Sequence, residues 1–270
     1  MSTVEVAGPA RRESMQQWER AEIARSAVEA ELTPDETLRV PRDIYARYVS
    51  PPADTAYPLE FAFHLLGGVR GKRILDLGCG SGGNTALLVN RGAHVWGIDI
   101  SEDLLRLGRR RLTVSGCPGE ATFVAGSAHD MPFPDASIDV VFGMAILHHV
   151  DLDLVAREVL RVLKPGGRAI FQEPVRNSAV LGFLRRLVPY HAPDISPFER
   201  PLTDEELRRF AGGFSRCEAR AFELPPVQVG RVLRRPGDRC HALYEWDRRL
   251  LRAAPWLARY ASIRVISLTK

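Results

Sequence analysis

A glycine-rich turn followed by a separate acid is the part of the sequence best suited to ligand chemistry. Residues 76–83 read Asp-Leu-Gly-Cys-Gly-Ser-Gly-Gly and end an apolar run that starts at Arg73. Glycine lets the backbone approach a ligand closely, and the helix expected next points unpaired N–H groups at that ligand. About twenty residues further on, a second apolar run ends in Asp99, whose carboxylate can accept both hydroxyls of a ribose. The spacing predicts an adenosine-type cofactor lying across these strand ends.

Two cofactor classes fit a turn of this kind. Gly78, Gly80 and Gly83 satisfy the G-x-G-x-x-G spacing of nicotinamide dinucleotide sites. Asp76 precedes the first glycine by two residues, and a carboxylate there repels a pyrophosphate but attracts an ammonium group. In addition, the first predicted strand begins only at Arg73, and no separate substrate domain follows the fifth strand. The residues therefore favour a cofactor that carries an ammonium group.

Five segments, in chain order, resemble the motifs of class I S-adenosylmethionine-dependent methyltransferases and come closest to the small-molecule type 11 branch. They are residues 74–82, 97–101, 126–134, 137–141 and 163–167. The resemblance implies a Rossmann-like, mostly parallel seven-stranded sheet of order 3-2-1-4-5-7-6, with helices on both faces. It also implies S-adenosyl-L-methionine as cofactor and S-adenosyl-L-homocysteine as product.

The resemblance assigns cofactor contacts to eight residues of this sequence. They are Asp76, Gly78 and Gly80 at the methionine part, Asp99 at the ribose, Ile100, Ser127 and Ala128 at the adenine, and Gly143 at the ammonium group. Asp139, at the start of the fourth strand, is instead expected to tie down backbone.

Candidate catalytic residues follow the fourth and fifth strands, where the ligand crevice of such a sheet lies. A sulfonium methyl is already activated, so catalysis is mostly alignment, and a base is needed only if the acceptor must lose a proton. By resemblance to sugar and phenol O-methyltransferases, His148 or His149 would be that base and Glu173 its carboxylate partner. Two alternatives stay open: the first histidine only touches the cofactor, or alignment acts alone.

Strands and helices alternate along the middle of the chain, which predicts an α/β fold with a parallel sheet covered on both faces. The expected strands are 73–77, 94–99, 121–125, 138–143 and 168–172. After Glu173 the alternation stops. Thr203 and Glu206 form a capping-box pattern, residues 228–260 are expected to be helical, and 263–268 form a last strand.

Length and cysteine usage define the broad class. The chain has 270 residues, 45% of them hydrophobic, which suits one large domain with an appended lid. Its four cysteines form no C-x-x-C pair or zinc spacing, so no metal site is expected. Residues 1–12 lack the apolar core of a signal peptide, and no apolar run could span a membrane. We expect a cytoplasmic protein.

Charge is distributed unevenly. The net charge is +4, yet residues 1–150 carry −4 and residues 151–270 carry +8. Within 224–270, apolar residues including Leu243, Trp246 and Leu250 share one face of a helical pattern, and arginines occupy the other. This basic amphipathic helix is expected either to lie on a membrane or to pack as a lid over the acceptor. Nucleic acid is a less favoured partner.

The predicted organisation is an N-terminal helical lid over 1–56 and a methyltransferase domain over 57–270. The N-terminal helices, with Trp18, Tyr45, Tyr48 and Tyr57, and the stretch 174–262 are expected to cover a small hydrophobic or acidic acceptor. The aromatic side chains themselves could line that pocket, but scattered aromatics are more often ordinary core residues. The predicted reaction moves a methyl group to O, N or C of a small molecule in bacterial specialised or lipid metabolism. The alternatives are an RNA or membrane-borne lipid acceptor, or a regulatory cofactor-binding protein without turnover. The oligomeric state stays open.

Overall fold

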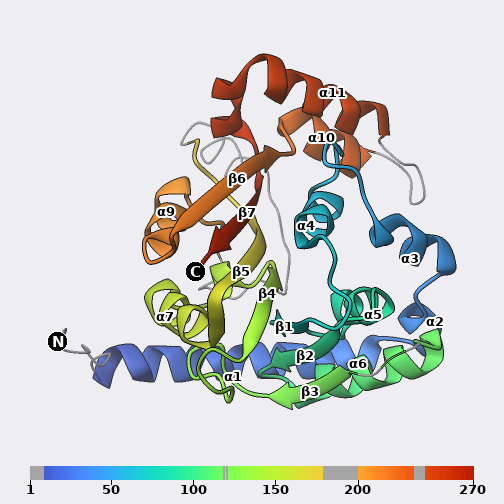
Figure 1. Ribbon diagram of the computed structural model, residues 1–270, viewed down its shortest axis with the longest axis vertical. Helices are drawn as coiled ribbons and strands as arrows, with labels where there is room; N and C mark the ends of the chain where they lie inside the picture. Colours follow the sequence, from blue (N-terminus) through green and yellow to red (C-terminus); the bar gives the residue numbers. More distant parts are fainter. Residues whose placement is uncertain (1–8, 118, 120, 179–199, 234–240) are drawn as a thin grey trace.

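A seven-stranded sheet forms the centre of the computed structural model, which describes residues 9–117, 119, 121–178, 200–233 and 241–270 (Figure 1). The strand order is β3-β2-β1-β4-β5-β7-β6, as predicted. The first five strands are parallel, and β7 runs antiparallel to both β5 and β6. The strands are β1 (Arg73–Leu77), β2 (His94–Asp99), β3 (Ala121–Ala125), β4 (Ile138–Met144), β5 (Leu163–Pro174), β6 (Arg216–Phe222) and β7 (Ile263–Thr269).

Helices connect and cover these strands. They are α1 (Pro9–Leu32), α2 (Asp35–Leu38), α3 (Arg42–Val49), α4 (Pro58–Leu66), α5 (Gly83–Asn90), α6 (Glu102–Ser115), the short η1 (Leu147–His149), α7 (Leu152–Val162), α9 (Asp204–Ala211), α10 (Pro225–Leu233), α11 (His241–Ala253) and η2 (Pro255–Tyr260). The capping box at the start of α9 is present as predicted, because Thr203 and Glu206 each accept from the other's backbone N–H. Asp151 caps α7, which begins directly after η1.

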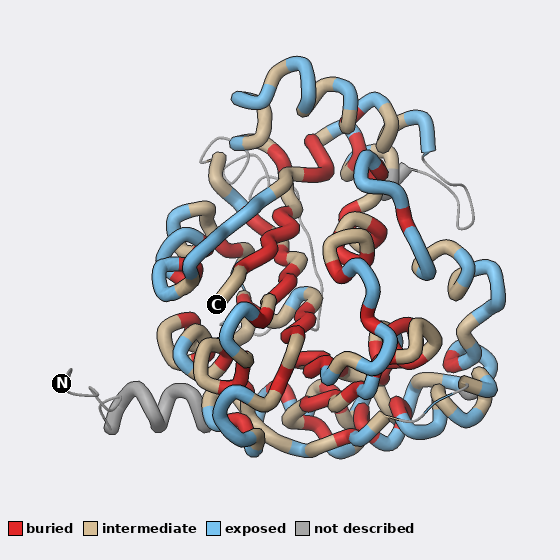
Figure 2. Tube along the Cα trace, viewed as in Figure 1, coloured by how far each residue is buried: buried red, intermediate tan, exposed pale blue. Residues whose placement is uncertain are grey.

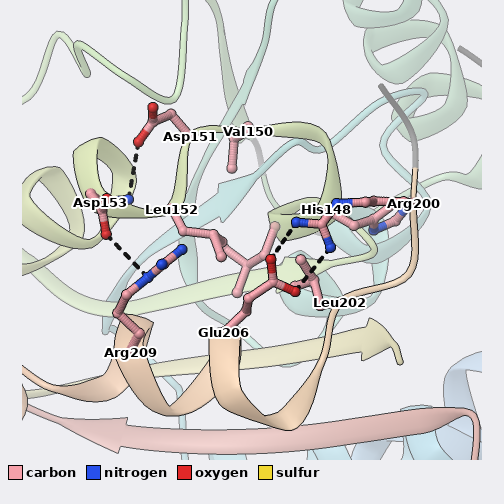
Figure 3. A pocket seen from close by; sticks show the side chains of 10 residues that line it. His148, Val150, Asp151, Leu152, Asp153, Arg200, Leu202, Glu206 and Arg209 are labelled. Atoms are coloured by element: carbon pink, nitrogen blue, oxygen red, sulfur yellow. Dashed lines mark hydrogen bonds and ion pairs between the residues drawn. The ribbon is translucent and has the colours of Figure 1, made fainter. Parts of the chain in front are cut away.

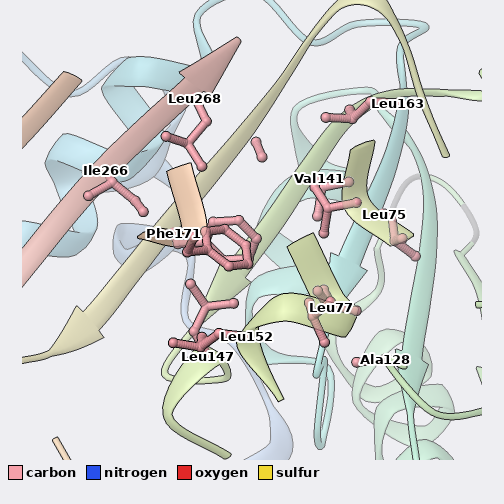
Figure 4. Close-up of a cluster of buried hydrophobic side chains, with 14 of the residues drawn as sticks. Leu75, Leu77, Ala128, Val141, Leu147, Leu152, Leu163, Phe171, Ile266 and Leu268 are labelled. Atoms are coloured by element: carbon pink, nitrogen blue, oxygen red, sulfur yellow. The ribbon is translucent and has the colours of Figure 1, made fainter. Parts of the chain in front are cut away.

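The sheet has a hydrophobic core on each face. Because strand side chains alternate in direction, Leu75 and Leu77 of β1 pack into one core while Ile74 packs into the other. Figure 4 shows the first core, where Val141 and Phe171 meet Leu77. Burial on both faces is typical of parallel strands, and Figure 2 shows buried residues concentrated along the central strands.

Two expected elements differ in the structure. The predicted helix over 228–260 is divided: α11 ends at Ala253 because Pro255 cannot continue it, and η2 follows. The strand expected at 168–172 is longer, since Leu163 already pairs with Ile138 before a shift in register. Within the stretch 174–262, residues 179–199 and 234–240 lie outside the described residues. In the part that is described, no helix is long and apolar enough to cross a bilayer.

The two helical regions outside the common sheet lie at opposite ends of the molecule. In Figure 1, α1 runs along the lower edge, and it contacts α6. Helices α10 and α11 lie at the upper end, beyond β6. The N-terminal helix therefore lies on the part of the sheet that carries the glycine turn, while the basic C-terminal helix does not.

Candidate functional site

The glycine turn at the end of β1 is shaped by a close approach between two segments. Gly78 has a φ of +68°, and a Cβ there would lie 2.6 Å from Cδ1 of Ile146, in the segment after β4. The backbone N–H groups of Gly78 and Cys79 both donate to the carbonyl of Ile98 in β2. A side chain at position 78 would therefore force apart the two segments that enclose this edge of the sheet.

Asp99 lies at the end of β2 beside that turn. Its carboxylate accepts from the N–H of Gly80 and of Ser101, each at 2.9 Å. Burial raises the pKa of Asp99, and the negative charge of Glu22 on α1 raises it further, although the backbone hydrogen bonds act in the opposite direction. The Asp99 carboxylate is therefore a hydrogen-bond acceptor whose negative charge is only partly compensated.

A small cavity lies over these residues, and we call it the glycine-turn pocket. Its lining includes five of the eight predicted cofactor residues: Gly78, Asp99, Ile100, Ser127 and Ala128. The remaining lining comes from α1, from the strand ends and from the segment after β4: Trp18, Glu19, Leu77, Ile98, Gly126, His129, Ile146 and Val150.

The other three predicted cofactor residues stand behind this lining. Asp76 is buried, accepts from the Thr85 hydroxyl at 2.6 Å, and has a pKa that burial raises to about 7. Gly80 acts through its N–H on Asp99. Gly143 lies in β4, where a Cβ would meet the Phe171 ring at 2.7 Å, so close packing by itself requires a glycine there.

Asp139 has the structural role expected of it. Its carboxylate accepts from the N–H of Arg73 at 2.8 Å and from Nζ of Lys164 at 2.6 Å. These bonds join the start of β4 to β1 and β5, away from the glycine-turn pocket.

His148 and Glu173 form a hydrogen-bonded pair between β5 and η1. Nδ1 of His148 lies 2.9 Å from Oε2 of Glu173. The other oxygen of Glu173 accepts from the N–H of Ile146 at 2.9 Å and of Leu147 at 2.8 Å. Glu173 is 1% exposed, so it orients the turn and the imidazole rather than meeting a ligand itself. A proton on Nδ1, facing the carboxylate, makes Nε2 the nitrogen that can accept a proton.

His149 is in a different environment, although its ring centroid is only 4.0 Å from that of His148. Burial lowers the pKa of His149 to about 3, and the neighbouring His148 and Arg25 contribute to this shift. The indole of Trp18 on α1 lies against it, with ring centroids 6.1 Å apart. His149 is therefore a weak base, and His148 is the better candidate of the two.

A second cavity, the polar pocket, lies beside η1 (Figure 3). Its lining combines η1 and the start of α7 with the start of α9: Leu147, His148, Val150, Asp151, Leu152, Asp153, Arg200, Leu202, Glu206 and Arg209. The Arg200 guanidinium makes two hydrogen bonds to Glu206 and holds the pKa of that carboxyl near 2. Val150, directly after η1, lines both pockets, so the two cavities are neighbours at this point.

The tyrosines that could have lined an acceptor pocket are packed elsewhere. Tyr45 and Tyr48 pack against the core on the α4 and α5 side, which is the ordinary role favoured for them, and the Tyr57 ring centroid lies 4.7 Å from that of Tyr244 of α11 in a tilted contact. None of the three tyrosines lines either pocket. Trp18 was expected over the acceptor, but it lines the glycine-turn pocket instead.

Sequence reasoning missed two polar contacts in that pocket. Glu19 on α1 accepts from the Ser127 hydroxyl at 2.6 Å and lies 3.2 Å from Nδ1 of His129. Nε2 of His129 in turn accepts from the N–H of Asp151. No spacing in the sequence connects position 19 with positions 127 and 129, because only the fold brings them together.

Comparison with known proteins agrees with this geometry. Residues 75–171 match the family model described as a methyltransferase domain. A ubiquinone/menaquinone biosynthesis C-methyltransferase of Vibrio vulnificus is 38% identical over 123 residues, which cover 43% of this chain and 47% of that protein. A fatty-acid O-methyltransferase of Mycolicibacterium smegmatis is 38% identical over 108 residues, covering 39% of this chain and 38% of that one. The chain thus matches less than half the length of these curated relatives.

A solved structure extends the likeness of the fold beyond the matched domain. The geranyl diphosphate C-methyltransferase of Streptomyces coelicolor superposes with a TM-score of 0.56 at 18% identity, covering 78% of each chain. At this identity the likeness concerns the fold alone.

Proposed function

Residues 75–171 form a class I S-adenosylmethionine-dependent methyltransferase domain, and we propose that the chain transfers the methyl group of that cofactor to a small molecule. O, N and C acceptors were all expected from the sequence. The single observation that favours an acceptor losing a proton, such as a hydroxyl, is the His148–Glu173 pair beside the polar pocket. An amine that reacts in its neutral form has no need of a base at that point.

The glycine-turn pocket suits a cationic adenosine cofactor. Asp99 lines this pocket and Asp76 is buried behind its lining, and burial raises the pKa values of both carboxyls, so their negative charge lacks full compensation. A sulfonium and an ammonium group relieve that deficit, whereas a pyrophosphate aggravates it. Asp99 would hold the ribose, Ile100 and Ala128 would enclose the adenine, and the turn at Gly78 would accommodate the methionine part. The cofactor supplies an activated methyl group.

The polar pocket is the proposed acceptor site. His148 lines it, and Glu173 fixes the tautomer in which Nε2 can take a proton from an acceptor hydroxyl. Val150, shared by both pockets, places the two cavities next to each other at η1. In this arrangement His148 is the catalytic base and Glu173 is a positioning residue, while His149, which lines neither pocket, takes no part in the chemistry.

We place the acceptor in lipid or quinone metabolism, because the relatives named above are a quinone-biosynthesis C-methyltransferase and a fatty-acid O-methyltransferase. The proposed compartment is the cytoplasm. The described cysteines, Cys79, Cys117 and Cys217, form no disulfides, which suits a reducing environment.

A screen of acceptors tests the function. Purified chain and S-adenosylmethionine are incubated with a reduced naphthoquinol, a long-chain fatty acid, a simple phenol and a primary amine, and release of S-adenosylhomocysteine is measured. The proposal expects release with a hydroxyl-bearing compound and its loss in His148→Ala. Release with the fatty acid alone contradicts the assigned base, because its carboxylate has no proton to lose. Turnover on the amine that is unaffected by His148→Ala contradicts the assigned base. Binding of the cofactor without turnover on any compound supports the regulatory alternative.

A membrane-borne acceptor is a second candidate, favoured by the surface of the C-terminal helices. Trp246 of α11 and Trp256 of η2 are both more than half exposed, and Arg249 and Arg252 are exposed beside them in the sequence. Exposed tryptophans with arginines are typical of segments that lie on anionic lipid. Co-sedimentation with anionic vesicles, lost in Trp246→Ala and absent with neutral vesicles, is the expected result. No sedimentation with either vesicle contradicts this candidate.

A further inference from the structure

The buried face of α1 is polar, which is unusual for a helix that packs on a domain. Trp18, Glu22 and Ser26 recur every four residues, so they share one face, and all three are buried. Three large apolar residues of the same helix are exposed instead: Ile23, Val28 and Leu32. Since burial of apolar surface usually holds a helix in place, this pattern needs another explanation.

Two atoms on that face lack a hydrogen-bond partner. Among the described residues, Nε1 of Trp18 and Oε1 of Glu22 are buried without one, and the residues themselves are only 8% and 6% exposed. The other carboxylate oxygen of Glu22 is held by Arg25 at 2.6 Å. Buried indole N–H groups and carboxylate oxygens normally have partners, because leaving them unpaired is costly. An unpaired donor and an unpaired acceptor one helical turn apart therefore point to a missing polar ligand.

The place of this ligand follows from the neighbours of the two residues. Trp18 lines the glycine-turn pocket together with Asp99, Ile100 and Gly78. Glu22 lies close enough to Asp99 for its charge to act on that carboxylate. Two neighbouring carboxylates are stabilised by a ligand that brings hydroxyl donors or positive charge between them.

We propose that α1 is part of the cofactor site, with the Trp18 indole N–H donating to the bound cofactor and the Glu22 carboxylate accepting from it beside Asp99. The inference rests on the proposed function and extends it to a helix outside the residues that match the family model. Because Asp99 is the ribose ligand in that proposal, Glu22 takes a hydroxyl donor from the same part of the molecule.

Calorimetric titration with S-adenosylhomocysteine tests the two contacts. Glu22→Gln removes the charge but keeps the shape, and Trp18→Phe keeps the aromatic contact with His149 but removes the donor. We expect affinity to fall on the order of tenfold in Glu22→Gln and about fivefold in Trp18→Phe. Glu31→Gln is the matched control, since it makes the same change at an exposed position of α1 and should bind like the wild type. The melting temperature of Glu22→Gln without ligand should change little, because removing the repulsion of Asp99 offsets the loss of the ion pair with Arg25.

Trypsin cleavage supplies a second measurement. Arg20 is exposed on α1, and S-adenosylhomocysteine should slow cleavage after it in the wild type but much less in Glu22→Gln. If the wild type fails to bind S-adenosylhomocysteine, the proposed function itself is wrong. If the wild type binds and both variants bind equally well, only the role of α1 is overturned. Tighter binding by Trp18→Phe also overturns it, because the indole then competes with the cofactor.

Discussion

Replacing Glu173 by glutamine should change the tautomer of His148, and with it the turnover, far more than it changes the stability of the fold. In the wild type one carboxylate oxygen accepts two backbone N–H groups and the other faces Nδ1 of His148. A glutamine in the same position can keep its oxygen on the backbone and turn its NH₂ group toward Nδ1. That NH₂ donates, so Nδ1 must become the acceptor and the proton moves to Nε2. The base would then be held in the wrong tautomer.

The expected magnitudes differ for activity and stability. Loss of a positioned general base lowers turnover by about 10²- to 10⁴-fold. The two backbone bonds lose only their charge assistance, about 1 kcal/mol each, so the free energy of unfolding should fall by about 2 kcal/mol. In a chain of this size that corresponds to a drop of roughly 4–8 °C in the melting temperature. Affinity for S-adenosylhomocysteine should not change.

The assay measures S-adenosylhomocysteine release at saturating cofactor, together with the imidazole ¹⁵N shifts of His148, which report the tautomer without any acceptor. Glu158→Gln is the matched control: that carboxylate also accepts a backbone N–H, from Met131, and pairs with Arg161, but it lines neither pocket. It should lose stability and keep its turnover. Full turnover in Glu173→Gln would refute the reasoning, as would an unchanged tautomer.

Three further predictions concern neighbouring groups. Asp99→Asn should weaken S-adenosylhomocysteine binding by about 10- to 100-fold in calorimetry while the chain stays folded by circular dichroism; unchanged affinity would remove Asp99 from the cofactor site. His149→Phe should keep most of the turnover and His148→Phe should lose it, since the pKa of His149 is near 3; equal losses would contradict this assignment. Burial raises the pKa of the Asp76 carboxyl from 3.8 to about 7, so the folded chain holds this proton to higher pH than the unfolded chain does. The unfolding free energy of the wild type should therefore fall relative to that of Asp76→Asn as the pH rises from 3.8 to about 7, and then level off. Denaturant titrations of both proteins across this pH range measure the difference. A difference that does not change with pH would exclude this linkage.

Local sequence signals predicted the sheet well because each acts over a few residues. The turn at Gly78 and the capping box at Thr203 depend on neighbours within the same short segment, and both are present. The strand order was implied by the resemblance of the five motifs to a known family, and the structure has that order. The break before η2 could have been predicted from Pro255, but the regular spacing of apolar residues outweighed it.

Contacts between distant segments could not be predicted in the same way. The place of Trp18 in the glycine-turn pocket depends on where α1 lies across the strand ends, and nothing within α1 specifies that position. The polar pocket similarly needs Arg200 and Glu206 to meet η1 through the packing of α9 against α7. For His148 and Glu173, the resemblance proposed a pair, and the structure added that Glu173 also holds the turn itself.

Calorimetric titration of the wild type with S-adenosylhomocysteine and, separately, with NAD tests the central claim most directly. The account predicts one S-adenosylhomocysteine bound per chain, no heat from NAD, and competition by S-adenosylmethionine at the same site. Binding of NAD with no binding of S-adenosylhomocysteine would contradict the account, because the uncompensated carboxylates Asp76 and Asp99 would then have accommodated a pyrophosphate.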